Sequence, residues 1–329
     1  MPRAAPAARP HLGAVPPPPA PRSWIPGAEA SAFPLTRLPL GVRRRPDGSH
    51  AVCTRVSDRV ADLRVLAEIG VYDDTGASRT DFAEASLNRL LARGEQVLAA
   101  VRKRTTACLD DDPNYWDLRQ RAEIFLLPHD RVRAVLPVDP GDYTRLAPAP
   151  ATGALQRREA RAAHLLVEGG RDAELADGFG GVRERVGRLG FGLVLGSAEG
   201  GAFAFGALGL TDWWPAGKTS RDELAAGRRT LVAAWVTPLE AYGGGDLPLA
   251  ARLRGGGHAI EGEVARTRLE LPVDALLASL RSGGTLTRAG DLYALPGPPL
   301  APPADVWIAE DLPRVRADAW AAAATLPPA

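Results

Sequence analysis

Short, mainly apolar runs recur along much of the chain, which is typical of β-strands, and in the last of these runs apolar and polar residues alternate. The runs with this pattern are 51–56, 59–63, 191–195, 203–210, 230–236, 249–253 and 259–271. The last two flank Gly255, Gly256 and Gly257, and a glycine turn between alternating runs predicts a β-hairpin. We therefore expect a protein built mainly of β-sheet.

One stretch shows a different spacing of apolar residues. Six apolar residues recur at helical spacing with charges between them, and they are Leu87, Leu90, Leu91, Val97, Leu98 and Val101. This spacing predicts a helix, and a second helix is expected over 275–281. The run from Asp110 to Pro113 predicts a turn and a helix start, where carboxylates suit the unpaired amides. Three adjacent aspartates could also bind a cation, and this alternative stays open.

Composition and charge exclude several classes of protein. The 329 residues are 45% apolar and carry 40 basic against 39 acidic side chains, so no overall field attracts nucleic acid or a membrane surface. No run reaches the roughly 20 apolar residues that span a bilayer. Two cysteines make neither a disulfide framework nor a zinc cluster. We expect a cytoplasmic protein.

The chain divides into three parts by composition. Residues 1–22 are rich in proline, alanine and arginine, and we expect a disordered tail there. Residues 23–135 and 136–329 are expected to form two folded domains. The run 147–151 alternates alanine and proline, which is typical of a linker.

Several proline-punctuated motifs stand at the start of the first domain and at the junction with the second. They are Ser23-Trp24-Ile25-Pro26, Phe33-Pro34, Leu38-Pro39-Leu40-Gly41-Val42, Ala85-Ser86-Leu87-Asn88 and Pro140-Gly141-Asp142-Tyr143-Thr144. In these motifs the chain resembles the fumarylacetoacetase family. The resemblance implies an α+β, mainly β fold, with an SH3-like barrel at 23–135 followed by a large mixed β-roll at 136–329. It also implies a homodimer formed through the second domain.

The resemblance implies a metal-dependent chemistry that this sequence does not retain. Family members cleave a carbon–carbon bond of a β-diketo acid, with a carboxylate-bound divalent metal as Lewis acid and a His–Glu pair that activates water. The first metal-binding aspartate corresponds to Arg145, and a Glu-x-Glu pair corresponds to Gly192 and Val194. Only Asp212 keeps its carboxylate. We therefore expect neither metal nor cofactor.

The catalytic histidine of the family corresponds to Thr152. The remaining candidates for catalysis are Asp212, His164 and Lys218. A stray histidine and a loop lysine are common surface residues, so those two also have an ordinary structural interpretation. A lysine whose pKa is lowered by burial could stabilise an enolate or form an imine.

The candidates for substrate binding are mainly basic and aromatic. Arginines can hold a carboxylate with two parallel hydrogen bonds, and adjacent tryptophans can wall a pocket as well as pack in a core. These candidates are Arg145, Arg228, Arg229, Trp213, Trp214 and Tyr143.

Two functional classes follow from these residues. In the first, the protein is a metal-independent enzyme acting on a β-dicarbonyl or other anionic small molecule, by cyclisation, isomerisation or C–C bond chemistry in bacterial secondary metabolism. In the second, it is an inactive paralogue that binds a ligand or a partner. Orthodox hydrolysis of β-diketo acids is a further alternative, which the loss of ligands disfavours.

Overall fold

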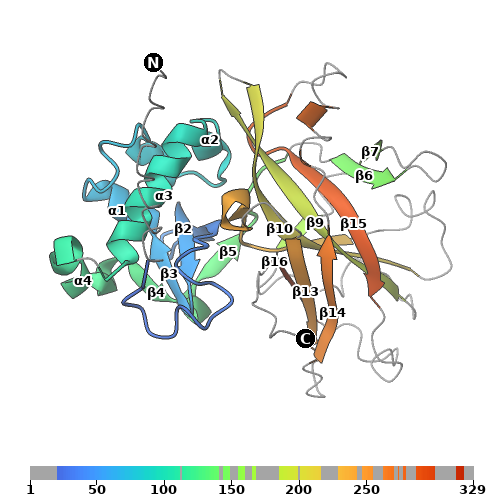
Figure 1. Cartoon of the computed structure of the whole chain (residues 1–329), viewed down its shortest axis with the longest axis horizontal. Coiled ribbons are helices and arrows are strands. Elements are labelled where there is room, and N and C mark those ends of the chain that lie inside the picture. Colours follow the sequence, from blue (N-terminus) through green and yellow to red (C-terminus); the bar gives the residue numbers. More distant parts are fainter. Residues whose placement is uncertain are drawn as a thin grey trace, which may run out of the picture.

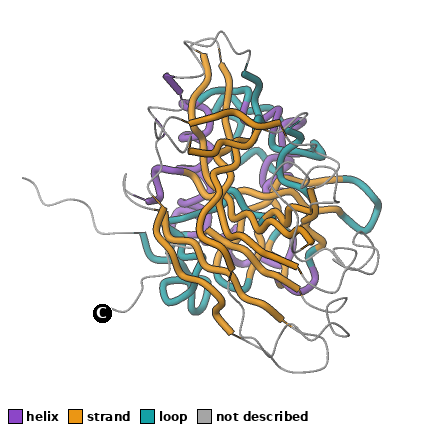
Figure 2. The backbone as a smooth tube through the Cα atoms, turned by 90° about the vertical axis from the view of Figure 1, so that its right-hand side faces the viewer, coloured by secondary structure: helices purple, strands orange, loops and turns teal. Residues whose placement is uncertain are grey.

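The computed structural model divides into a helical N-terminal part and a part made of long strands (Figure 1). It describes residues 21–111, 113–140, 144–148, 155–159, 165–167, 185–198, 201–215, 229–242, 247–254, 262–269, 273, 277–278, 287–300 and 316–321. Figure 2 shows the long strands crossing most of the height of the molecule. The expected mainly β, α+β class is confirmed.

The N-terminal part is one antiparallel sheet with helices on its connections. Its strands, in the order β4-β3-β2-β1-β5, are Leu126–Pro128, Arg59–Asp62, His50–Val56, Leu40–Arg44 and Arg133–Val135. Its α-helices are α1 (Leu63–Glu68), α2 (Asn88–Leu91), α3 (Glu95–Leu109) and α4 (Trp116–Gln120), with short 3-10 turns at 79–82, 113–115, 122–124 and 129–131. The predicted strands at 51–56 and 59–63 are thus confirmed.

A second sheet has eight strands in the order β7-β6-β15-β9-β10-β11-β8, with β12 paired to β10. In that order its strands are Leu155–Glu159, Thr144–Pro148, Leu292–Leu300, Arg185–Ala198, Gly201–Pro215, Arg229–Val232 and Leu165–Val167, with β12 at Thr237–Pro238. A 3-10 turn, η6 (Leu239–Tyr242), follows β12. A third sheet contains β13 (Leu247–Arg254), β14 (Gly262–Leu269) and β16 (Arg316–Ala321).

In the rest of the chain, some of the elements predicted from the sequence are confirmed and others are not. The hairpin is confirmed, because β13 and β14 pair antiparallel from Leu247 opposite Leu269. The predicted linker is wrong in part, since Ala147 and Pro148 belong to β6 and pair with β7. The single helix at 87–101 is two helices, because Gly94 has a φ of 88° between α2 and α3. The three-glycine turn and most of the predicted helix at 275–281 lie outside the described residues.

The aspartate run forms the expected turn, and a 3-10 helix begins directly after it at Pro113. Asp110 ends α3 and accepts hydrogen bonds from the amides of Arg22 at 3.0 Å and Asp111 at 2.8 Å. Asp111 pairs with Arg119 at 2.6 Å. In the described part of the chain, which excludes Asp112, no cluster of three metal-binding side chains is present.

One hydrophobic core joins the N-terminal part to the second sheet. Leu40, Val42 and Leu66 belong to the same buried cluster as Val194 and Leu208. The two parts also share a backbone bridge, in which the amides of Leu40 and Val236 each donate to the other's carbonyl at 2.8 Å. None of the helices described is long and apolar enough to cross a membrane.

Gly41 permits this bridge. A Cβ at this position would lie 2.7 Å from the Ala234 carbonyl oxygen and 2.8 Å from the Trp235 ring, closer than real contacts allow. The glycine of the Leu-Pro-Leu-Gly-Val motif is therefore required by the crossing of β1 and the 233–236 segment.

A buried ion pair between Arg43 and Asp62 links two strands of the first sheet and the start of α1. The Asp62 carboxylate accepts from Arg43 Nε at 2.9 Å and from the α1 amide of Val65 at 3.2 Å, and its side chain is 1% exposed. Asp62→Ala leaves the Arg43 guanidinium buried without its carboxylate and should lower the free energy of unfolding by about 3–5 kcal/mol. Urea denaturation measures this. Asp58→Ala, which removes an exposed pair with Arg59, should cost no more than about 1 kcal/mol.

Candidate functional site

The structure gives backbone positions for five of the residues proposed from the sequence. Arg145 lies on β6, Asp212, Trp213 and Trp214 lie on β10, and Arg229 lies on β11. The other four, Tyr143, His164, Lys218 and Arg228, lie outside the described residues.

The strand register brings some of these positions together. Asp212 stands opposite Arg188 on β9 and opposite Thr230 on β11. Arg229 stands opposite Trp213, one register position from Asp212, and successive positions occupy opposite faces of a sheet. Arg145 lies on β6, and the two strands β15 and β9 separate β6 from β10. Asp212 and Arg229 are thus neighbours in the sheet, whereas Arg145 is not beside them.

The positions that the resemblance assigns to the first metal ligands do meet in the sheet. Arg145 pairs with Ala294, Ala294 with Gly192, and Gly192 with Leu208, which makes one row across four strands. Val194 follows two residues after Gly192 on β9 and is fully buried.

Leucine side chains fill the space over Gly192. A Cβ there would lie 2.5 Å from Leu292 Cδ1, 3.1 Å from Leu208 Cδ1 and 3.3 Å from Leu210 Cδ1. All three leucines are at most 2% exposed. A glutamate has no room at this position, and hard cations need several oxygen ligands. The residues present around Gly192 therefore do not fit the metal of the family.

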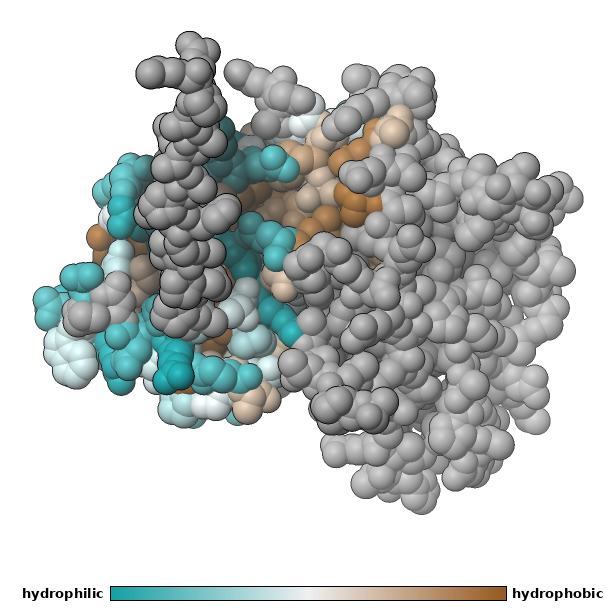
Figure 3. Space-filling view, in the orientation of Figure 1, coloured by the Kyte–Doolittle hydropathy of each residue, from teal (hydrophilic) through white to brown (hydrophobic). Residues whose placement is uncertain are grey.

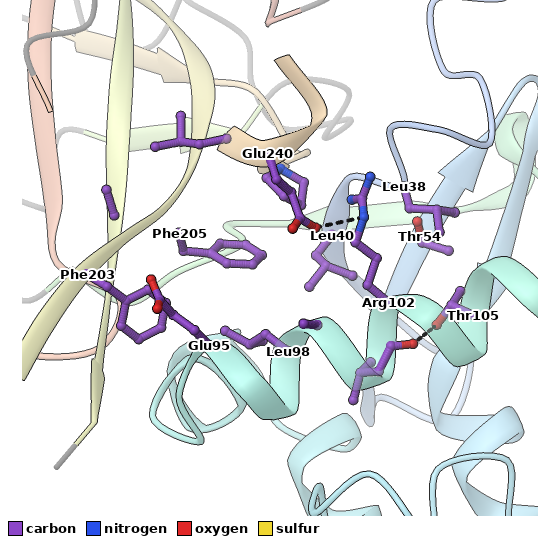
Figure 4. A pocket seen from close by; sticks show the side chains of 15 residues that line it. Leu38, Leu40, Thr54, Glu95, Leu98, Arg102, Thr105, Phe203, Phe205 and Glu240 are labelled. Carbon is purple, nitrogen blue, oxygen red and sulfur yellow. Dashed lines mark hydrogen bonds and ion pairs between the residues drawn. The ribbon is translucent and has the colours of Figure 1, made fainter. Parts of the chain in front are cut away.

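The structure also contains a pocket that the sequence did not reveal. It has a volume of 360 Å³ and lies where α3 and β1 face β10 and η6 (Figure 4). Apolar side chains make most of its wall, among them Leu38, Leu40, Leu98, Phe203 and Phe205. Figure 3 shows apolar side chains gathered over the upper part of β9 and β10, beside the polar surface of the N-terminal part.

A break in the pairing of β9 with β10 shapes one wall of this pocket. Ala204 pairs with Leu195 and Gly206 pairs with Val194, so Phe205 is an extra residue on β10. Phe203 and Phe205 are two residues apart on this strand, and both line the pocket beside the bulge. The Phe203 ring lies over Gly196, where a Cβ would be 2.1 Å from Phe203 Cζ.

A second glycine positions the rim of the pocket. A Cβ on Gly206 would lie 2.6 Å from the carbonyl oxygen of Thr237. The glycine therefore allows β12 to approach β10, and Leu239 and Glu240 of η6 follow directly into the pocket.

Three of the described residues that line the pocket are charged, and they are Arg102, Glu240 and Glu95. Arg102 Nε donates to Glu240 at 2.8 Å, and its terminal nitrogens donate to the carbonyl of Arg37 at 2.8 Å and to that of Thr36. Burial lowers the pKa of Arg102, and Glu240 opposes that effect. Glu95 begins α3 and is exposed, and among the described residues no hydrogen bond or ion pair engages its carboxylate.

Sequence reasoning missed this pocket because its residues come from separate segments. Only the alternation of Phe203 and Phe205 in an apolar run marked one wall, and that pattern predicts core packing equally well. The charged residue Arg102 stands in a helix among other arginines.

Comparison with known proteins identifies the N-terminal part. Residues 36–137 match the fumarylacetoacetase N-terminal family. Fumarylacetoacetases of Dictyostelium discoideum and Oryza sativa subsp. japonica are 28% identical over 125 and 129 residues, in each case 37% of this chain. These alignments span only 29% and 30% of the two relatives. The resemblance seen in the sequence is thus confirmed for this domain.

Solved structures with a similar arrangement have low sequence identity. A fumarylacetoacetate hydrolase from Exiguobacterium antarcticum has a TM-score of 0.49 at 13% identity, covering 79% of this chain and 87% of that one. A maleylpyruvate hydrolase from Sphingobium sp. SYK-6 has a TM-score of 0.43 at 16% identity, covering 78% and 87%.

Packing over Gly192 can be tested by adding a methyl group. Gly192→Ala should lower the free energy of unfolding by about 1–3 kcal/mol, because Leu292 is buried and has little freedom to move away. Leu292→Ala removes the atom that clashes. The loss of unfolding free energy in the double variant should therefore be smaller than the sum of the losses in the two single variants, as measured by a double-mutant cycle in denaturant. Strict additivity would show that the two side chains do not compete for this space.

A half-buried histidine, His129, gives a pH-dependent prediction. Burial, and next the charge of Arg55 with its nitrogen 3.1 Å away, lower the pKa of His129 from 6.5 to about 4, against the opposing charges of Asp130 and Asp58. Between these two pH values the unfolded chain binds a proton that the folded chain does not. The free energy of unfolding should therefore fall as pH is lowered from 6.5 to about 4. His129→Gln should flatten this decline in urea titrations, and an unchanged slope would contradict the assignment.

Proposed function

We propose that this protein is a metal-independent enzyme that acts on a small anionic or β-dicarbonyl substrate, on a scaffold of the fumarylacetoacetase type. The proposal extends the family match at 36–137 to the rest of the chain. In it, the first sheet is the SH3-like barrel of a domain at 23–135, and the longer strands form the β-roll of a domain at 136–329. Two copies associate through that second domain.

The observation that carries metal independence is the packing over Gly192. In relatives the corresponding strand is expected to supply carboxylates, whereas here Leu292, Leu208 and Leu210 occupy the space next to the backbone. A buried carboxylate without a metal or a hydrogen-bond donor would be strongly unfavourable. In a site without a metal, apolar side chains around Gly192 are therefore more favourable than carboxylates.

The anionic substrate is inferred from the basic positions on the second sheet. Arg145 replaces an expected carboxylate, and Arg188 and Arg229 stand at or beside the register position of Asp212. We assign Asp212 the role of counter-ion to one of these arginines. With Lys218 and His164 it forms the catalytic set of the proposal, and Arg228, Trp213, Trp214 and Tyr143 complete the substrate contacts.

Oriented cations can act without a metal. Held against a β-dicarbonyl compound, they would stabilise the negative charge that develops on an enolate oxygen. Positioning of the reacting groups would supply a further part of the rate. This chemistry suits isomerisation, cyclisation or C–C bond cleavage.

A second candidate function is a catalytically inactive paralogue that binds a ligand. The pocket between α3 and β10 favours it, because that pocket is largely apolar and, of the proposed site residues that the structure describes, none is among its lining residues. Orthodox metal-dependent hydrolysis is disfavoured by the lack of room at Gly192.

Measurements of metal binding and of anion binding distinguish the metal-independent enzyme from the inactive paralogue and from a metal-dependent hydrolase. Protein dialysed against EDTA should show no rise in melting temperature when Mg²⁺ or Mn²⁺ is added, whereas acetopyruvate should raise it by mass action. Arg229→Ala should weaken acetopyruvate binding in calorimetry, and Arg59→Ala, on the first sheet, should not.

Stabilisation by stoichiometric Mg²⁺ or Mn²⁺ would contradict metal independence. Binding of acetopyruvate with no conversion of it, followed by NMR, would favour the inactive paralogue. Absence of acetopyruvate binding to the unaltered protein would remove the basis for an anionic substrate.

A further inference from the structure

We propose that the pocket between α3 and β10 binds an apolar small molecule that carries a protonated amine. This inference does not rest on the proposed function. Phe205 is seven residues before Asp212 on β10, roughly 23 Å along an extended strand. The two sites can therefore be tested separately.

The apolar part of the ligand is defined by the walls of the pocket. Leucines from α3 and from the start of β1 face the rings of Phe203 and Phe205 across the cavity (Figure 4). A volume of 360 Å³ is within the range of small-molecule sites. Such a lining favours an aromatic or branched aliphatic body.

The charge of the ligand follows from the polar groups of the pocket. Glu95 and Glu240 contribute two carboxylates, and among the lining residues that the structure describes Arg102 contributes the one cation. Arg102 is engaged by Glu240 and by the carbonyls of Arg37 and Thr36. The pocket therefore has an excess negative charge, with the Glu95 carboxylate open to a ligand.

Aromatic rings strengthen the preference for a cation. Glu95, Phe203 and Phe205 all line the pocket, and Figure 4 shows the Glu95 and Phe203 side chains on the same side of it in this view. Ring faces attract ammonium groups, and a carboxylate next to them adds a direct ion pair. A ligand carboxylate would instead lie near Glu95 and would have to displace Glu240 from Arg102.

The geometry of Phe203 ties the pocket to the backbone of β9. Its ring lies against Gly196, and any larger residue at 196 would displace it, since a Cβ would come within 2.1 Å of Cζ. Gly196 is thus a positioning residue for the aromatic wall and touches no ligand itself.

Three probes of similar shape and different charge test the proposal. They are 4-phenylbutylamine, 4-phenylbutanol and 4-phenylbutyrate, titrated into the full chain at neutral pH by calorimetry. The amine should bind most tightly, the alcohol more weakly and the carboxylate least. Added salt should weaken binding of the amine and leave that of the alcohol unchanged.

Substitutions then assign the charge preference to named residues. Glu95→Gln should weaken amine binding about two- to fivefold, as expected for an exposed ion pair, and leave the alcohol unaffected. Glu123→Gln, an exposed carboxylate away from the pocket, is the matched control and should change neither. Gly196→Ala should weaken amine and alcohol alike, because it moves the Phe203 ring.

Each outcome decides the proposal. Tighter binding of the carboxylate than of the amine would overturn the assignment of charge. Equal binding of all three probes, or an amine affinity unchanged by Glu95→Gln, would show that Glu95 does not recognise the ligand. No binding of any probe at millimolar concentration would overturn the site itself, and the melting temperature of each variant confirms that it is folded.

Discussion

The crossing of two backbones at Gly41 is the constraint on which the remainder of the structure depends. Only glycine leaves β1 close enough to the 233–236 segment for Leu40 and Val236 to exchange hydrogen bonds. This contact ties the second sheet to the first and closes one continuous core between them. The chain then passes directly into β12 and Glu240, so the rim of the pocket is set by the same crossing.

In the N-terminal part, the strands at 51–56 and 59–63 and the helical stretch from Leu87 could be predicted from their apolar patterns, and the proline motifs carried the resemblance to a family. The break at Gly94 was missed because apolar spacing continues across it, whereas only the positive φ interrupts the helix. The pocket could not be predicted, since Leu38, Leu98, Phe203 and Glu240 meet only through tertiary packing. At Gly192 the sequence showed the loss of a carboxylate but not the leucines that replace it.

The second sheet combines an apolar face with charged positions further along its strands. Gly192, Leu208 and Leu292 belong to the part that packs against the N-terminal core. Arg188 and Asp212 pair four residues further along β9 and β10. One end of these strands is therefore buried in the core, whereas the other carries charged residues at paired positions. A change of chemistry at the charged end need not disturb the core that holds the two parts together.

The extra residue at Phe205 has a consequence for comparing this chain with its relatives. Phe203 shares a row with Gly196, whereas Leu208 shares one with Gly192, so the two halves of β10 alternate out of phase by one residue. An alignment guided by hydrophobic alternation can match one half of the strand correctly only by shifting the other. Residues of β10 must therefore be aligned with those of a relative separately on each side of the bulge. The pairing with β11 fixes the position of Asp212, and the pairing with β9 fixes that of Phe203.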